Sequence, residues 1–399
     1  MWEDHKFPKS CFRFRINGIS LMLNYFFGVI TRGEKQMTKR MGALLLTLLL
    51  TVSLALTACS SKQEPKEALK TAAANASKLT SYEMSSNFTI NELSYKPADE
   101  SQQDPTMTQF MSMLKDAQFN VTGVYQSEPM QTEMTVSLEL KGDMGMTFTI
   151  PMVMTAEKLY VKVPSIPFFP IPETVVGKFL ELDLKELAEQ EGTEWNPDAM
   201  DTAKTQKLSN EVMDAVLSEY DQDKFFKNVD VKDAQLPEGV DAKQVVQFSV
   251  TNDNVSEAVK VMITKALPKA IDIVAKEEYR DMLQLNQTDI DQAKADLKSV
   301  AEDKEEMSRI DRINEVLTIN NFNIDFALDK QDFPVYQKIA ADLLIKPVDT
   351  KDEVKLAFTG SNTYTKINEK AAFKINIPTG ENVITMQEFE ELMNSSYGY

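Results

Sequence analysis

Hydrophobic and polar residues alternate with a period of two through a long part of the chain that begins near residue 82. Tyr82, Met84, Phe88 and Ile90 alternate with polar residues, which is the pattern of a strand with one buried and one solvated face. Further runs of this kind follow at residues 119–125, 134–140, 146–154 and 159–163. Short links join the runs, so we predict five antiparallel strands in a meander with one apolar face.

The even-numbered positions of the first strands carry many methionine and phenylalanine residues. Residues two apart in a strand project from the same face of a sheet, and the flexible thioether of methionine suits an adaptable apolar surface. The candidate ligand-binding residues are therefore Met84, Phe88, Met134, Met146, Phe148, Met152 and Met154. Two interpretations stay open, because this face either lines a ligand cavity or forms solid core. In both, we expect the middle helices to cover it.

The hydrophobic period changes to that of an α-helix in the middle of the chain. Helices are predicted for residues 65–79, 176–189, 198–220, 255–275, 289–316 and 386–394, and the stretch 289–316 is strongly acidic. Strand patterns return at residues 226–231, 245–251, 322–328, 337–345, 354–360, 361–368 and 371–377. Residues 97–117 are predicted to form a loop with a helical turn. Strands, then helices, then strands predict an α+β fold in which the middle helices close over one large sheet.

A proline-rich apolar segment, residues 163–174, interrupts these patterns. Its four prolines exclude a helix or a central strand, so an extended loop is predicted. This loop either folds over the edge of the sheet or forms a lid or a membrane-facing lip.

A continuous apolar run near the N-terminus, residues 43–56, follows the basic residues Lys39 and Arg40. This arrangement is typical of a secretory signal peptide. The run ends in Leu56-Thr57-Ala58-Cys59, which resembles the bacterial lipobox. The resemblance implies that Cys59 receives a diacylglycerol and becomes the first residue of a mature protein held at the extracytoplasmic face of the cell membrane. Two or three acyl chains suffice for stable attachment, whereas the alternative, a spanning helix, needs roughly 20 apolar residues and the run has about 14.

Met37 is the predicted start of translation, because the signal peptide is complete from this residue onward. We interpret residues 1–36 as an over-extended gene model, since they hold His5 and Cys11 and match no export element. The alternative is a genuine segment whose apolar stretch, residues 16–30, packs in the membrane.

The charge balance of the chain after the lipobox limits its partners. The first 58 residues hold eight of the 43 basic residues and three of the 61 acidic ones, which leaves a formal charge of −23 on the remainder. Such a charge argues against binding nucleic acid and against adsorption of the protein surface on an anionic bilayer. We therefore expect no nucleic-acid partner, and we assign the membrane anchoring to the lipid.

The side chains of common catalytic and metal-binding sites are absent from the sequence after Cys59. His5 is the single histidine, and Cys11 and Cys59 are the two cysteines. Catalytic triads, zinc sites made of His or Cys, and disulfides are therefore excluded downstream of the lipobox. Two segments, at residues 221–223 and 289–291, begin like calcium loops but lack the glycine and glutamate that such loops need. We expect no catalytic residue, metal or cofactor, and an enzyme that relies on carboxylates alone is the least favoured hypothesis.

Three segments together resemble one known family. They are Glu157-Lys158-Leu159-Tyr160-Val161-Lys162, the stretch from Leu328 to Tyr336, and the stretch from Ala372 to Pro378. Their order is similar to that in LolA/LppX-type lipoprotein carriers and related Gram-positive lipoproteins. The resemblance implies a curved antiparallel half-barrel wrapped around helices, with an apolar cavity that carries lipid in the characterised relatives. The acidic helical stretch looks like an insertion, at about residues 276–316, that would cover or reshape the opening of such a cavity.

The expected organisation is a signal peptide at residues 37–58, a lipidated tether at 59–66 and a single LolA/LppX-like domain at 67–399. The favoured function is that of a non-enzymatic, membrane-anchored envelope lipoprotein that binds an apolar or amphiphilic ligand, such as a lipid, between sheet and helices. The alternative is a surface interaction or sensory module without a ligand cavity, whose acidic insertion contacts another envelope protein. A contiguous cavity along the methionine-rich face would distinguish the two.

Overall fold

The computed structural model describes residues 62–99, 104–141, 145–165, 171–190, 196, 202–347 and 350–397. Met37, the predicted signal peptide, Cys59 and part of the proline-rich loop lie outside the described residues. The strands are β1 (Ser81–Lys96), β2 (Gln118–Gln126), β3 (Gln131–Leu140), β4 (Met146–Thr155), β5 (Lys158–Lys162), β6 (Phe179–Asp183), β7 (Phe226–Val229), β8 (Gln244–Ser249), β9 (Leu317–Leu328), β10 (Pro334–Ile345), β11 (Glu353–Thr365) and β12 (Val383–Thr385).

The helices lie mostly between β6 and β9 in the sequence. They are α3 (Pro65–Ala76), α4 (Pro105–Leu114), α5 (Leu184–Gln190), α6 (Thr202–Ser218), α7 (Gln222–Phe225), α8 (Val255–Val261), α9 (Leu267–Val274), α10 (Glu277–Met282), α11 (Gln287–Glu302), α12 (Lys304–Asp311) and α13 (Met386–Tyr397). A π-helical segment, η3 (Met262–Ala266), joins α8 to α9, and short 3-10 turns occur at η4 (Ile313–Glu315) and η5 (Gly380–Asn382).

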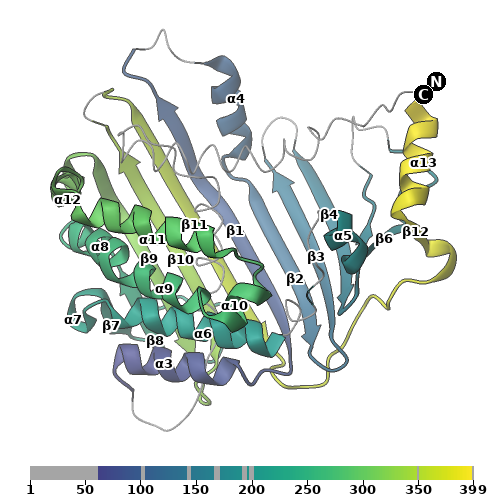
Figure 1. Cartoon of the computed structure of the whole chain (residues 1–399), viewed down its shortest axis with the longest axis horizontal. Helices are drawn as coiled ribbons and strands as arrows, with labels where there is room; N and C mark the ends of the chain where they lie inside the picture. Colours follow the sequence, from purple (N-terminus) through teal and green to yellow (C-terminus); the bar gives the residue numbers. More distant parts are fainter. Residues whose placement is uncertain are drawn as a thin grey trace.

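Twelve strands form one open sheet in the order β12-β6-β5-β4-β3-β2-β1-β11-β10-β9-β8-β7 (Figure 1). Neighbouring strands are antiparallel, apart from β12, which runs parallel to β6. Residues 83–96 of β1 pair with residues 365–353 of β11, so an N-terminal strand joins the C-terminal strands at the centre of the sheet. The predicted α+β class, with a large antiparallel sheet wrapped around helices, is confirmed.

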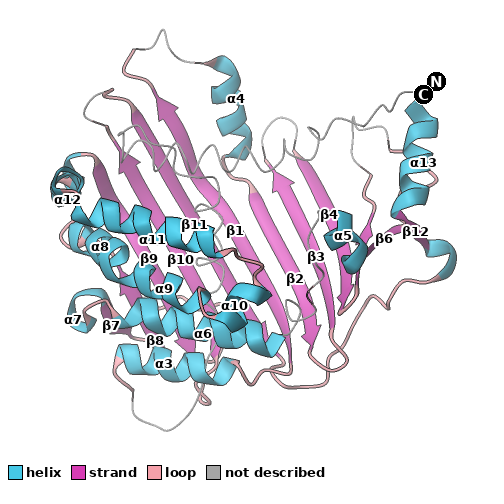
Figure 2. Ribbon diagram, viewed as in Figure 1, coloured by secondary structure: helices cyan, strands magenta, loops and turns pink. Residues whose placement is uncertain are grey.

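The main hydrophobic core lies between the helices and the half of the sheet that contains β7 to β10 (Figure 2). Small residues of α3, including Ala68 and Ala72, pack with Phe248 of β8 and Phe326 of β9 in one cluster of buried side chains. The face of the sheet that carries these side chains is called the inner face below. The opposite face is called the outer face.

Residues 276–316 contribute α10, α11 and α12, which form part of a further layer of helices. Ile290 and Leu297 of α11 pack on Ile271 of α9. Tyr279 of α10 packs with Leu208 of α6. The acidic stretch is therefore attached to other helices through its apolar residues, as expected for an amphipathic helix.

Several predicted elements differ from the structure, and the predicted helix 289–316 is divided into α11, α12 and η4. Residues 176–189 were expected to be one helix, but they contain strand β6 and the short helix α5. Pairing of β6 with β5 and β12 decides its conformation, because tertiary contacts override a weak local preference. The predicted strands 354–360 and 361–368 form the single strand β11. Gly360 lies within β11 and does not mark a turn. Glycine leaves space there for neighbouring side chains, because a Cβ atom at this position would lie 3.0 Å from Ile339 and 3.4 Å from Phe88.

The predicted strand 371–377 is also absent, and these residues form an extended segment without a strand partner among the described residues. The segment lies on the outer face, where the carboxylate of Glu133 on β3 accepts hydrogen bonds from the backbone N–H groups of Lys374 (2.5 Å) and Ile375 (2.7 Å). Val124 and Val153 flank Glu133 in the register and are buried although they face away from the helices. We call residues 371–378 the C-terminal strap, which covers this part of the outer face.

We expect Glu133→Ala to destabilise the protein by about 1 to 3 kcal/mol, because it leaves two backbone N–H groups of the strap without their acceptor. Chemical denaturation monitored by circular dichroism would measure the change. Glu139→Ala on the same strand is the matched control, since its carboxylate has no such bond, and it should change stability by about 0.5 kcal/mol or less. Equal effects of the two substitutions would contradict the role given to Glu133.

Candidate functional site

The register of the first four strands places all seven predicted ligand-binding residues on the inner face. Met84, Met134 and Met152 lie in one row that crosses β1, β3 and β4, with Gly123 between them on β2. Phe88 and Phe148 lie in a second row with Phe119 and Leu138, and Met146 and Met154 occupy the two ends of β4 on the same face. Sequence alternation therefore identified a contiguous apolar surface, which we call the apolar face.

The expectation that the middle helices cover the apolar face is wrong for β2 to β5. The helix-packed clusters of buried residues include side chains of β7 to β10 and, as a half-buried neighbour, Tyr82 of β1, but no described side chain of β2 to β5. Figure 2 likewise shows the main group of helices over the other half of the sheet. The reason is that α6 to α12 adjoin β7, β8 and β9 in the sequence and pack on these strands. The amphipathic pattern of a helix does not specify which strands it will cover.

Three phenylalanines cluster where the apolar face meets β11. Phe88 of β1 and Phe119 of β2 belong to the apolar face, and Phe358 of β11 packs beside them and against a helix-packed cluster. The ring of Phe88 lies 6.3 Å from that of Phe119 and 5.5 Å from that of Phe358, measured between centroids. Phe88 remains 37% exposed and Phe119 36% exposed. Gly360 leaves room for Phe88, as described above. Adjacent exposed aromatic side chains are a common feature of binding surfaces.

The lower end of the apolar face, at the start of β1, is closed by tyrosines. The ring of Tyr82 lies 5.0 Å from that of Tyr125 and 5.6 Å from that of Tyr364, and the latter two residues are buried. Burial raises the pKa of the Tyr82 hydroxyl, with a further contribution from the neighbouring Tyr364 and Tyr125. The phenol therefore stays neutral at physiological pH, so this end of the face is uncharged.

Helix α4 stands near the other end of the face, beside the part of β1 that extends past β2 (Figure 1). It contains no charged residue, and its Met107 and Phe110 side chains are 43% and 46% exposed. The sequence interpretation, a loop with a helical turn, underestimated this helix. Two signals were available: Asp104 caps its first turn by accepting from the N–H of Thr106, and Pro105 occupies the first position.

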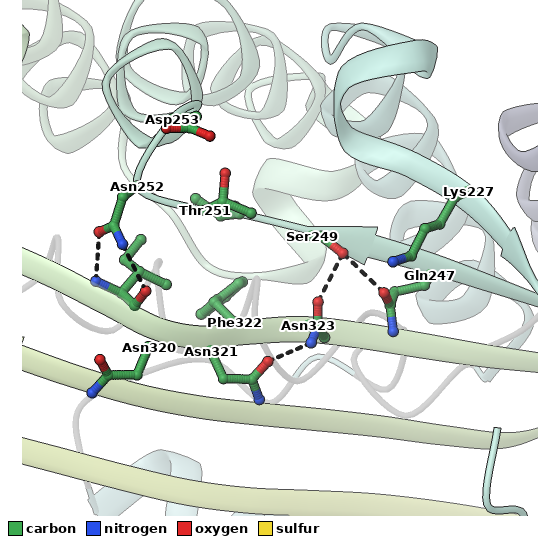
Figure 3. Close-up of a pocket in the computed structure, with 12 residues that line it drawn as sticks. Lys227, Gln247, Ser249, Thr251, Asn252, Asp253, Asn320, Asn321, Phe322 and Asn323 are labelled. Carbon is green, nitrogen blue, oxygen red and sulfur yellow. Dashed lines mark hydrogen bonds between the residues drawn. The ribbon is translucent and has the colours of Figure 1, made fainter. Parts of the chain in front are cut away.

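A cavity of about 410 Å³ lies on the outer face, where β8 ends beside β9 (Figure 3). Its lining includes Gln247, Ser249, Asn321 and Asn323, which lie on the outer face, and also the apolar inner-face residues Ile319 and Phe322. None of the seven candidate residues lines this cavity. Sequence reasoning missed it, although three asparagines at positions 320, 321 and 323 inside a strand pattern are unusual.

Within the described ranges, no group of three or more His, Cys, Asp or Glu side chains is placed to hold a metal ion. No helix among the described residues has the length and apolar character needed to cross a membrane. Comparisons with protein-family models and with curated proteins find no match. The resemblance to LolA/LppX-type carriers therefore stays a prediction that rests on the sequence motifs.

Adjacent residues of β4 allow a direct test of how open the apolar face is. Met152 is half-buried on the apolar face, whereas Val153 on the outer face is 0% exposed. We expect Met152→Trp to change the free energy of unfolding by less than about 1 kcal/mol, since the larger ring extends into open space. Val153→Trp should overpack a filled site and destabilise by about 1 to 3 kcal/mol. Thermal and chemical denaturation would measure both, and a larger loss for Met152→Trp would show that the apolar face is solid core.

Proposed function

We propose that this protein is a non-enzymatic envelope lipoprotein, anchored through a lipid on Cys59, that binds an apolar or amphiphilic ligand on its apolar face. The observation that carries the proposal is the contiguous inner face of β1 to β5, which bears exposed Phe88 and Phe119. Among its described residues, only Tyr82 of β1 packs against a helix-packed cluster. An exposed apolar surface that is retained in a folded protein commonly serves binding.

The size of the apolar face suits such a ligand. Four neighbouring strands span roughly 14 Å, and the ten residues of β4 span roughly 30 Å, which gives an area of about 400 Å². Patches of about this size are the largest found on typical monomers and are often functional. Each methylene group that a ligand buries there contributes about 0.8 kcal/mol, so an acyl chain would bind well without any polar contact.

The position of the tether supports an orientation of the protein at the membrane. The backbone of Gln63, just before α3, is held by the side chain of Gln244 at the start of β8, with bonds of 3.2 and 2.8 Å. Helix α4 lies near the opposite end of the strands (Figure 1). A lipid on Cys59 would thus anchor the end of the sheet that is remote from α4, so the more open end of the apolar face would point away from the anchoring membrane.

The ligand-binding part of the proposal is tested with a double substitution, Phe88→Ser with Phe119→Ser. Loss of two phenyl groups from the contact should weaken binding of a fluorescent fatty acid by tenfold or more, because burying one such side chain contributes about 1.5 to 3 kcal/mol. The matched control is Leu283→Ser with Ile377→Ser, two residues of similar exposure that lie off the apolar face. Mass spectrometry of the purified parent protein should also detect co-purified lipid.

Two results would oppose this proposal. If the parent protein neither carries lipid nor binds the fatty acid, the interaction-module hypothesis is favoured instead. If both double variants bind equally well, the apolar face is not the binding site.

The anchoring part of the proposal predicts that Cys59→Ser abolishes labelling of the protein with a radioactive fatty acid. A thioether with diacylglycerol requires the sulfur, so the serine variant should remain uncleaved or be released from the membrane. Ser61→Ala, two residues after Cys59, is the matched control and should leave the labelling unchanged. Full labelling of the Cys59→Ser variant would end the lipoprotein interpretation.

A further inference from the structure

The polar cavity on the outer face has no role in the proposed binding of an apolar ligand. It lies where β8 ends at Ser249 and the chain turns toward α8, while β9 continues alongside. Figure 3 shows amide and hydroxyl groups from β8, β9 and the turn gathered around it. The contrast with the inner face points to a ligand of different chemistry.

The sequence of β9 near the cavity has a low propensity to form a β-strand. Asn320, Asn321 and Asn323 lie within four positions of each other, and asparagine is depleted in strands. The pairing with β10 also shifts here, between Asp342 and Leu343, so that Asn320 is an extra residue in the ladder. Bulges of this kind often re-aim side chains next to functional sites.

Hydrogen bonds hold the lining side chains in fixed orientations. The amide of Gln247 donates to Asp325 at 2.6 Å, the hydroxyl of Ser249 lies 2.7 Å from the amide oxygen of Asn323, and Asn323 donates in turn to Asn321. This chain of bonds orders the amides before any ligand arrives, which lowers the entropic cost of binding.

The turn after β8 is fixed in the same way. The side chain of Asn252 accepts from the backbone N–H of Ile319 at 2.8 Å and donates to its carbonyl at 2.9 Å. It thereby links the turn to β9 beyond Ser249 and Asn323, the last paired residues of β8 and β9. The wall of the cavity is consequently rigid.

Three polar groups at the cavity make no hydrogen bond or ion pair with any residue that the structure describes. They are the ammonium of Lys227, the hydroxyl of Thr251 and the carboxylate of Asp253. The two charges are opposite, and the remaining lining residues are five neutral amides, the hydroxyl of Ser249 and three apolar side chains, Val250, Ile319 and Phe322. The site therefore offers both donors and acceptors without an excess of either charge.

We propose that this cavity binds a neutral, hydroxyl-rich carbohydrate. A sugar hydroxyl both donates and accepts hydrogen bonds, which matches paired amide and hydroxyl groups. A polyanion would meet Asp253 and a chain of net charge −18. An apolar ligand would leave Lys227, Thr251 and Asp253 without partners at a cost. The inference does not depend on the apolar face, because the two sites lie on opposite faces of the sheet.

The test is calorimetric titration of the detergent-solubilised full chain with two tetrasaccharides, one of N-acetylglucosamine and one of glucose. We expect at least one of them to bind. Thr251→Val should weaken that binding about fivefold to tenfold, since it removes one hydrogen bond with little change of shape. Thr122→Val is the matched control, because Thr122 is an exposed threonine on the outer face of β2, and it should leave the affinity unchanged.

Further measurements distinguish a carbohydrate site from an anion site. Inorganic phosphate is the anionic probe. The proposal would be overturned in favour of an anion site if the parent protein binds phosphate but neither tetrasaccharide, and if Lys227→Met abolishes the phosphate binding. Absence of binding by both sugars, or equal affinities of the Thr251→Val and Thr122→Val variants, would also overturn it. The double substitution Phe88→Ser with Phe119→Ser should leave sugar binding unchanged. The carbohydrate proposal and the apolar-ligand proposal can therefore be refuted separately.

Discussion

The structure depends on one constraint: the inner face of the sheet continues across all of its strands, and the helices that the structure describes cover only part of it. Each strand places alternate side chains on that face, so the register keeps the apolar residues of β1 to β5 in line with those that pack under the helices. Burial of Val246, Phe248 and Phe326 by α3, α6 and α8 supplies a hydrophobic core. The remaining part of the face is a surface that a globular protein would normally hide.

The two faces of the sheet differ in the chemistry of their exposed side chains. On the inner face, Phe88 and Phe119 offer apolar contact without polar partners, whereas on the outer face a chain of amides holds a polar cavity. The outer face is not uniformly solvated, because Val124 and Val153 are buried on either side of Glu133, to which the C-terminal strap is hydrogen-bonded. Period-two alternation thus predicts which side chains share a face, but it does not predict what each face contacts.

Much of the sheet could be predicted from the sequence, because alternation over ten residues specifies both conformation and facing. The runs at 134–140 and 146–154 correspond closely to β3 and β4. Residues 371–377 alternate just as clearly and yet form no strand, since their alternation reflects packing of one side of an extended segment on the outer face. The sequence placed the seven candidate residues on one face, but it did not single out Phe119, whose ring lies beside Phe88 only because β2 pairs with β1. The polar cavity could not be predicted, because it requires the end of β8, the shifted pairing of β9 and Asn252 to meet in space.

The central pairing of β1 with β11 has a consequence for how the chain reaches its folded state. Residues near position 90 must wait for residues near position 358, and contacts of such sequence separation form slowly because closing a long loop costs entropy. During that interval the N-terminal hairpins would present their methionine-rich side and the open edge of β1 to other chains, which is a hazard for aggregation. A protein with this strand order would therefore benefit from a chaperone that occupies the edge of β1 until the last third of the chain has emerged.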